Sequence, residues 1–73
     1  MKDINKCKLG KNIKIQRLIK DITQEYFAEL VDISVSHVGK IEQGVTSPSS
    51  FVLYKMAKVL DIPMEEFFKG IEI

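Results

Sequence analysis

Two short amphipathic stretches, joined by only three residues, constrain the fold of this chain more than any other feature of its sequence. The first carries Phe27, Leu30 and Val31 at the i, i+3, i+4 spacing of a helix with one buried face. The second covers about residues 35–43 and again repeats apolar residues at helical spacing. Because residues 32–34 form so short a connection, the two helices must cross steeply, and the second must project from the surface.

Residues that start and stop helices divide the rest of the chain into three further helices. The first is expected over about residues 9–20 and the fourth over about residues 50–60, while a short fifth helix begins at Pro63 and ends at Gly70. The predicted caps are Thr23 and Ser34 at N-termini and Gly44 at a C-terminus. The other residues expected to face inward are Leu9, Ile13, Arg17, Leu18, Val38, Ile41, Leu53, Met56, Ala57 and Leu60.

The helical periods leave no convincing β-strand, so the sequence predicts an all-α fold, a compact five-helix bundle. At 73 residues the chain has room for one domain. We expect a basic N-terminal arm over residues 1–8, the folded domain over residues 9–69 and a short tail over residues 70–73. A domain of this size removes only about 60% of its unfolded surface from water, so pairing with a second copy would help its core.

The charges are distributed unevenly, although the net charge is only +1. Residues 1–20 hold seven basic groups against one acid, which is +6, and residues 21–73 hold four basic and nine acidic groups, which is −5. A cationic helix that only faces water explains this pattern, and so does a basic edge that meets phosphates. Charge alone leaves both interpretations open.

Several classes of function are not expected from this sequence. Cys7 is the only cysteine, so it forms no internal disulfide, and a reducing compartment, the cytoplasm, is predicted. No apolar segment suits a signal peptide or approaches the roughly 20 residues that span a bilayer. His37 has no companion at metal-ligand spacing, and the adjacent Glu65 and Glu66 point in different directions. We therefore expect no enzyme, no metal, no cofactor, no small-molecule ligand and no membrane partner.

Five segments that correspond to the five predicted helices cover about residues 9–68: LGKNIKIQR, TQEYFAELVDIS, VSHVGKIEQG, SPSSFVLYKMAKVL and DIPMEEFF. Within them a small residue, Ala28, sits where the second and third helices cross, and Ile33 fills the turn between them. In this pattern the chain resembles the Cro/phage-repressor helix-turn-helix family, also called the xenobiotic-response-element family. The resemblance implies a lambda-repressor-like domain of a bacterial or phage transcription regulator, whose third helix enters the major groove of double-stranded DNA.

The resemblance also implies roles for individual residues. Val35, Ser36 and Lys40 match the base-facing positions of the family, and Gln24 and Gln43 match positions that bond the DNA backbone. Arg17 and Glu42 match a structural ion pair that ties the first helix to the third. From their charge and place in the chain, the other expected backbone contacts are His37, Lys11 and Lys14.

The predicted base contacts are modest in chemical terms. Lys40 can donate to guanine O6 and N7, Ser36 can serve several bases, and Val35 can touch a thymine methyl group. None of the three is a bidentate Asn, Gln or Arg, so each contact is worth the low end of about 1–3 kcal/mol. Specificity would then require two half-sites and DNA shape, unless Ser36 and Lys40 belong to a helix surface that only faces water.

Three positions depart from the family pattern. Asp32 stands in the turn where the family prefers glycine, although aspartate tolerates the left-handed conformation better than most residues. Ser50 stands where a buried leucine is common. Gly39 lowers the helix propensity of the third helix by about 1 kcal/mol relative to alanine. Close approach to DNA and drift on an exposed face both explain Gly39.

An apolar C-terminal end predicts self-association. One of Phe67 and Phe68 should close the core, and the other should leave an apolar patch with Ile71 and Ile73. Since family members often dimerise through the last helix, we assign a homodimer interface to these four residues and expect a repressor. The alternative function is a protein-interaction module with this fold, such as an antitoxin or the partner of a regulator, which the near-neutral net charge favours.

Overall fold

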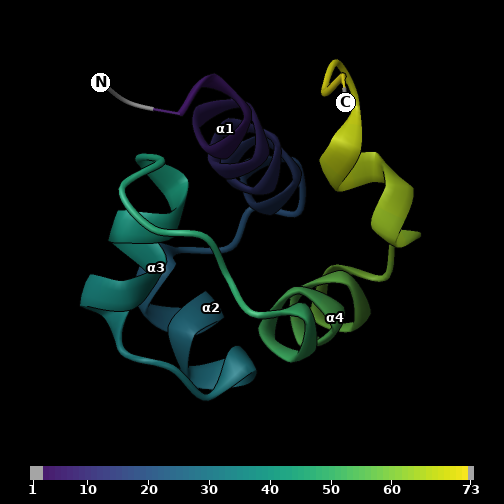
Figure 1. Cartoon of the computed structure of the whole chain (residues 1–73). Helices are drawn as coiled ribbons and strands as arrows, with labels where there is room; N and C mark the ends of the chain where they lie inside the picture. The colour runs from purple at the N-terminus through teal and green to yellow at the C-terminus, as the bar shows by residue number, and fades with distance from the viewer. Residues whose placement is uncertain (1–2, 73) are drawn as a thin grey trace.

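The computed structural model describes residues 3–72, and every regular element in that range is helical. Four α-helices, α1 (Ile4–Ile19), α2 (Gln24–Val31), α3 (Val35–Glu42) and α4 (Ser50–Leu60), are followed by a short 3-10 helix, η1 (Met64–Phe68). Helix α1 packs against α3 and η1, and α2 packs against α3 and α4 (Figure 1). The all-α prediction is confirmed, but the fifth element is a single stretch of 3-10 helix and not a fifth α-helix.

Helix α1 begins at Ile4, five residues before the predicted start at Leu9. The Asp3 carboxylate caps it by accepting hydrogen bonds from the backbone N–H groups of Asn5 (2.9 Å) and Lys6 (3.4 Å). The predicted arm over residues 1–8 is therefore helical from Ile4 onward, and its first two residues lie outside the described range. The sequence pattern missed this turn because its residues are mostly polar and carry no apolar period.

Side-chain caps fix the starts of the next three helices. The hydroxyl oxygens of Thr23, Ser34 and Ser49 each accept a hydrogen bond, at 3.0–3.1 Å, from the backbone N–H three residues further on. The predicted caps Thr23 and Ser34 are therefore confirmed, and Ser49 places the start of α4 at Ser50 as expected. Gly44, with φ 78°, has the left-handed conformation that was predicted for the end of α3.

The core collects apolar side chains from every helix. Its fully buried members include Ile13, Phe27, Val31, Val38, Ile41, Met56, Leu60 and Phe67. Two residues predicted to face inward are instead exposed, Leu18 at 55% and Leu30 at 43%. Successive residues of an α-helix are about 100° apart, so Leu18 lies about 100° from buried Arg17. Leu30 lies about 100° from buried Val31 and about 160° from buried Ala28.

Gly10 allows α1 and α3 to meet backbone to backbone. A Cβ atom at this position would lie 2.2 Å from the carbonyl oxygen of Ile41 and 2.8 Å from that of Glu42. The space exists only for a residue without a side chain, so Gly10 determines how closely the last turn of α3 approaches α1. The sequence pattern pointed to Ala28 as the small residue of the helix crossing and missed Gly10.

Three polar side chains of α1 fasten the end of the chain. Asn12 Nδ2 donates to the carbonyl oxygens of Phe67 (2.9 Å) and Lys69 (2.8 Å). Lys8 Nζ donates to the carbonyl oxygen of Gly70 at 2.9 Å, and Asn5 Nδ2 donates to the carbonyl oxygen of Glu72 at 3.2 Å. Residues 67–72 therefore run along α1.

Within the described range, no helix has the length and apolar character needed to cross a membrane.

Candidate nucleic-acid interface

The turn between α2 and α3 sets the geometry of the candidate site. Asp32 ends α2 with φ 66° and ψ 47°, the left-handed conformation that this turn requires. Ile33 follows, half-buried against the core, and its N–H donates to Ala28 O at 3.1 Å. Since Val38, Ile41 and Glu42 are buried on the inner side of α3, the opposite side of this helix is presented to the surroundings.

All three predicted base-reading residues are exposed, Ser36 and Lys40 on that outer side and Val35 at the first position of α3. Val35 is 45% exposed, and Ser36 and Lys40 are also exposed. Gly39 lies between them in a place where an added Cβ would meet no atom within 4 Å. Packing within the described part of the chain therefore does not require glycine at this position, unlike at Gly10.

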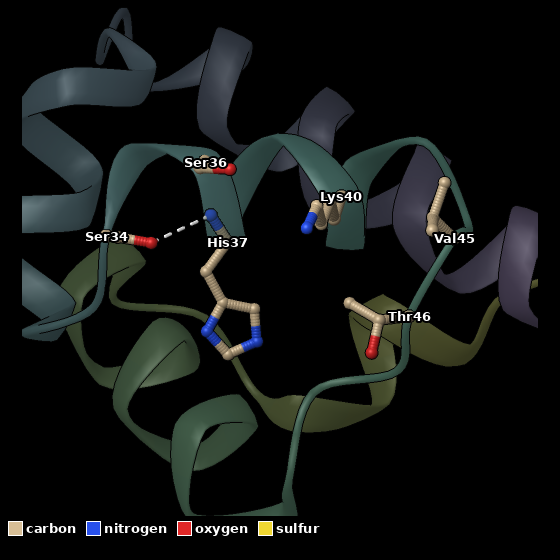
Figure 2. Close-up of a pocket in the computed structure, with 6 residues that line it drawn as sticks. All are labelled: Ser34, Ser36, His37, Lys40, Val45 and Thr46. Atoms are coloured by element: carbon tan, nitrogen blue, oxygen red, sulfur yellow. Dashed lines mark hydrogen bonds between the residues drawn. The ribbon is translucent and has the colours of Figure 1, made fainter.

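A hollow of about 460 Å³ borders the outer side of α3 (Figure 2). Figure 2 shows the His37 ring and the Thr46 side chain on opposite sides of it. The carbonyl oxygen of Lys40 accepts the N–H groups of Val45 (2.9 Å) and Thr46 (3.4 Å), which turns the loop back beside α3. The lining residues are Ser34, Ser36, His37, Lys40, Val45 and Thr46. Sequence reasoning missed Val45 and Thr46, whose only signal was their position directly after the Gly44 turn.

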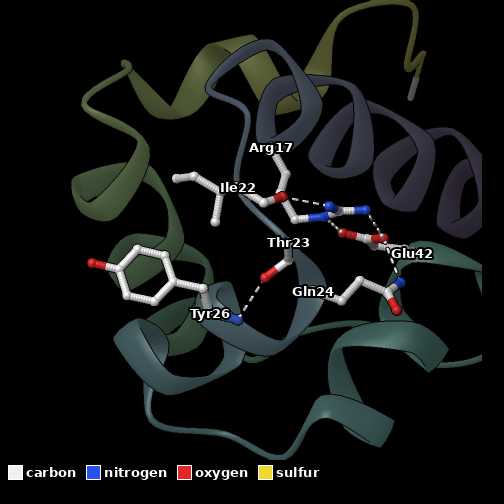
Figure 3. A network of polar contacts seen from close by, with 6 residues as sticks. All are labelled: Arg17, Ile22, Thr23, Gln24, Tyr26 and Glu42. Atoms are coloured by element: carbon white, nitrogen blue, oxygen red, sulfur yellow. Dashed lines mark hydrogen bonds and ion pairs between the residues drawn. The ribbon is translucent and has the colours of Figure 1, made fainter.

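A buried polar network joins α1, α2 and α3 (Figure 3). Arg17 and Glu42, the predicted ion pair, lie together with Arg17 Nε 2.7 Å from Glu42 Oε2 and a second N–H donating to Oε1 at 3.1 Å. Arg17 also donates to the carbonyl oxygen of Ile22 at 2.6 Å. Gln24 Nε2 completes the network by donating to Glu42 Oε1 at 2.9 Å, a contact that the sequence did not predict.

The remaining predicted backbone contacts lie at the surface. Gln43 is exposed where α3 ends, and Lys11 and Lys14 are exposed on α1. Lys11 follows Cys7 by four residues, and Lys14 follows Gly10 by four residues. Cys7 lies against Gly44, just after α3, and Gly10 lies against Ile41 of α3. Residues four apart share one side of a helix, so Lys11 and Lys14 lie on the side of α1 that turns toward α3.

The predicted self-association residues divide into three groups. Phe67 is fully buried, so it is the phenylalanine that closes the core, and its assignment to an interface is wrong. Phe68 is 43% exposed, and with Ile71 it lines a second hollow of about 360 Å³, whose other wall includes Leu9. Ile73 lies outside the described residues.

Comparisons with known proteins agree with this geometry. The helix-turn-helix family HTH_3 matches residues 13–67. The chain is 42% identical over 57 residues to the HTH-type transcriptional regulator YazB of Bacillus subtilis, which covers 78% of this chain and 83% of YazB. It is 31% identical to the HTH-type regulator RC0668 of Rickettsia conorii, covering 88% of this chain but only about half (51%) of that relative.

Solved structures share the fold. The restriction-modification controller protein C.AhdI of Aeromonas hydrophila superimposes with a TM-score of 0.87 at 32% identity, covering 90% of this chain and all (100%) of C.AhdI. SinR, a master regulator for biofilm formation whose structure was solved in complex with DNA, gives a TM-score of 0.78 at 27% identity, covering 84% of this chain and 98% of SinR.

Proposed function

Since this chain belongs to the Cro/phage-repressor type of helix-turn-helix transcriptional regulators, we propose that it regulates transcription by reading a specific DNA sequence with α3. The observation that carries this proposal is the exposed, polar outer side of α3, a helix whose inner residues Val38 and Ile41 are buried in the core. A helix of this size fits the major groove of B-DNA, which is about 12 Å wide.

Three side chains of α3 would read bases. Lys40 donates to guanine O6 and N7, Ser36 bonds one of several base edges, and Val35 packs on a thymine methyl group. The exposure of all three side chains along α3 supports this assignment. The open space around Gly39 would let this part of the helix approach the bases closely.

Phosphate contacts would hold α3 in its register. Helices α2 and α3 each begin with backbone N–H groups that have no intrahelical acceptor, and such ends attract anions. Gln24 stands at the start of α2, and His37 stands in the first turn of α3 beside the hollow. Gln43, Lys11 and Lys14 would bond the adjoining backbone from the other end of α3.

We further propose that the regulator acts as a homodimer, in the cytoplasm, and represses by occupying its operator. Exposed Phe68, half-buried Ile71 and the hollow that they line supply the apolar surface for pairing. Two copies related by a twofold axis would place their α3 helices in successive major grooves, about 34–36 Å apart.

The salt dependence of binding to a duplex of random sequence tests the DNA-binding part of the proposal. Each neutralised phosphate releases counterions, so we expect the affinity to fall steeply between low and physiological salt. Absence of measurable, salt-sensitive binding to the duplex would instead favour the protein-interaction alternative, because such a module needs little affinity for DNA.

A further inference from the structure

Gln24 belongs at once to the exposed start of α2 and to the buried network behind it. Its Nε2 atom donates to Glu42 Oε1 at 2.9 Å, and the Glu42 side chain is only 2% exposed. The same carboxylate accepts two N–H groups of Arg17, at 2.7 and 3.1 Å. Glu42, the last residue of α3, therefore holds Gln24, the first residue of α2, through a hydrogen bond (Figure 3).

This hydrogen bond determines which way the Gln24 amide points. A carboxylate only accepts hydrogen bonds, so it takes the amide nitrogen and turns the amide oxygen away. Figure 3 shows this orientation, with the Gln24 oxygen on the side opposite to Glu42. One of the two Nε2 protons is used by Glu42, and the second remains for an acceptor outside the network.

The hydrogen bond from Gln24 to Glu42 orients the Gln24 amide more than it stabilises the fold. Fixing a glutamine side chain costs about as much conformational entropy as one hydrogen bond returns. Arg17 already supplies two donors to the Glu42 carboxylate, so the ion pair would persist without Gln24. A role in stability alone does not explain why half-exposed Gln24 is held here.

We propose that Glu42 is a positioning residue for DNA binding: it holds the Gln24 amide so that the second Nε2 proton meets a DNA phosphate at the start of α2. Arg17 in turn holds Glu42, and Ile22 O holds Arg17. The inference rests on the proposed function, because it takes the α2–α3 unit to be the part of the chain that binds DNA. No direct contact between Glu42 and DNA is involved.

The test compares the effect of one substitution in two backgrounds. Gln24→Ala should weaken binding to a short fluorescent duplex of random sequence about tenfold, the low end for a hydrogen bond to a charged group. The second background carries Arg17→Met and Glu42→Leu together, because replacing both buried charges by apolar side chains preserves folding far better than removing one. There Gln24→Ala should cost less than about threefold, since the glutamine has already lost its position.

Gln43→Ala is the matched control, because this exposed glutamine at the end of α3 has no contact with the Glu42 carboxylate among the hydrogen bonds of residues 3–72. It should cost the same factor in both backgrounds. An equal loss from Gln24→Ala in both backgrounds would overturn the positioning role, and so would an unchanged affinity of Gln24→Ala in the wild-type background. Failure of the wild-type chain to bind any duplex is a different result, which overturns the proposed function itself.

A measurement on the wild-type protein covers the case in which the paired substitution prevents folding. Hydrogen exchange of the side-chain amides by NMR should show one Gln24 Nε2 proton protected relative to both protons of Gln43. Added random-sequence duplex should then protect the second Gln24 proton as well. Equal exchange of all four protons, with or without DNA, would contradict the inference.

Discussion

Three aspartates, each just after the last residues of an α-helix, have a strained backbone conformation. Asp21, Asp32 and Asp61 have φ values of 57°, 66° and 55°, in the left-handed region that glycine enters without cost. Asparagine and aspartate tolerate this region better than other residues, which explains why the turns form at all. The negative charge of Asp61 also lies at the C-terminal end of α4, where the helix dipole is negative.

Replacing Asp61 by glycine should therefore stabilise the protein. We expect the free energy of unfolding in urea to rise by about 0.5–1 kcal/mol, because the strain and the unfavourable charge both disappear. Asp61→Asn removes the charge and keeps the side chain, so it should recover only part of the gain. A lower unfolding free energy for Asp61→Gly would mean that the aspartate side chain makes a favourable contact in solution.

Lys40 is the residue whose role as a reader can be tested most directly. Lys40→Ala should weaken binding to the cognate duplex by about tenfold, near 1.4 kcal/mol, and weaken binding to random duplex less. Fluorescence anisotropy with both duplexes gives the two losses. Equal losses would make Lys40 a phosphate contact only, since such contacts weaken binding uniformly across sequences.

At the scale of the elements, local signals decided what could be predicted. Thr23 and Ser34 cap α2 and α3 from within their own first turns, so a sequence pattern finds them. Gly10 meets the carbonyl of Ile41, and Gln24 meets Glu42, so their roles depend on residues far away in the chain. The caps could therefore be predicted from the sequence alone. The Arg17–Glu42 pair that ties α1 to α3 could be predicted only from the family resemblance, and the contacts of Gly10 and Gln24 could not be predicted.

Two glycine substitutions make a matched pair that tests how α3 is seated. Gly10→Ala should destabilise the protein by about 1–3 kcal/mol, because its Cβ would collide with the backbone of α3. Gly39→Ala should stabilise it by about 1 kcal/mol, since open space surrounds this position. Urea unfolding measures both changes, and changes of the same sign would contradict the described packing.

DNA binding by Gly39→Ala then decides between the two explanations of this glycine. Close approach to the bases predicts weaker binding although the fold is more stable. Drift on an exposed face predicts unchanged binding.

Across the whole molecule, α1 holds residues 67–72 in place. Asn12 donates to the carbonyls of Phe67 and Lys69, and so fastens the segment that carries Phe67 into the core. This arrangement also sets the position of Phe68 and Ile71, which line the proposed surface for pairing. The sequence predicted the apolar residues of this end but not the polar side chains that orient them.

Asn12→Ala should therefore destabilise the fold by about 1–2 kcal/mol, because two carbonyl groups lose their donor and one of them is partly buried. Thermal unfolding followed by circular dichroism measures the loss. Asn5→Ala is the control, since its single exposed hydrogen bond of 3.2 Å should contribute less than about 0.5 kcal/mol. A loss from Asn5→Ala as large as that from Asn12→Ala would contradict the assigned roles.

Selection of bound duplexes from a random DNA pool at physiological salt shows whether α3 reads DNA sequence as part of a twofold dimer. We predict enrichment of an inverted repeat whose half-sites are about one helical turn apart, 10–10.5 base pairs. A pool that stays random, with weak and salt-sensitive retention, would contradict sequence reading by α3.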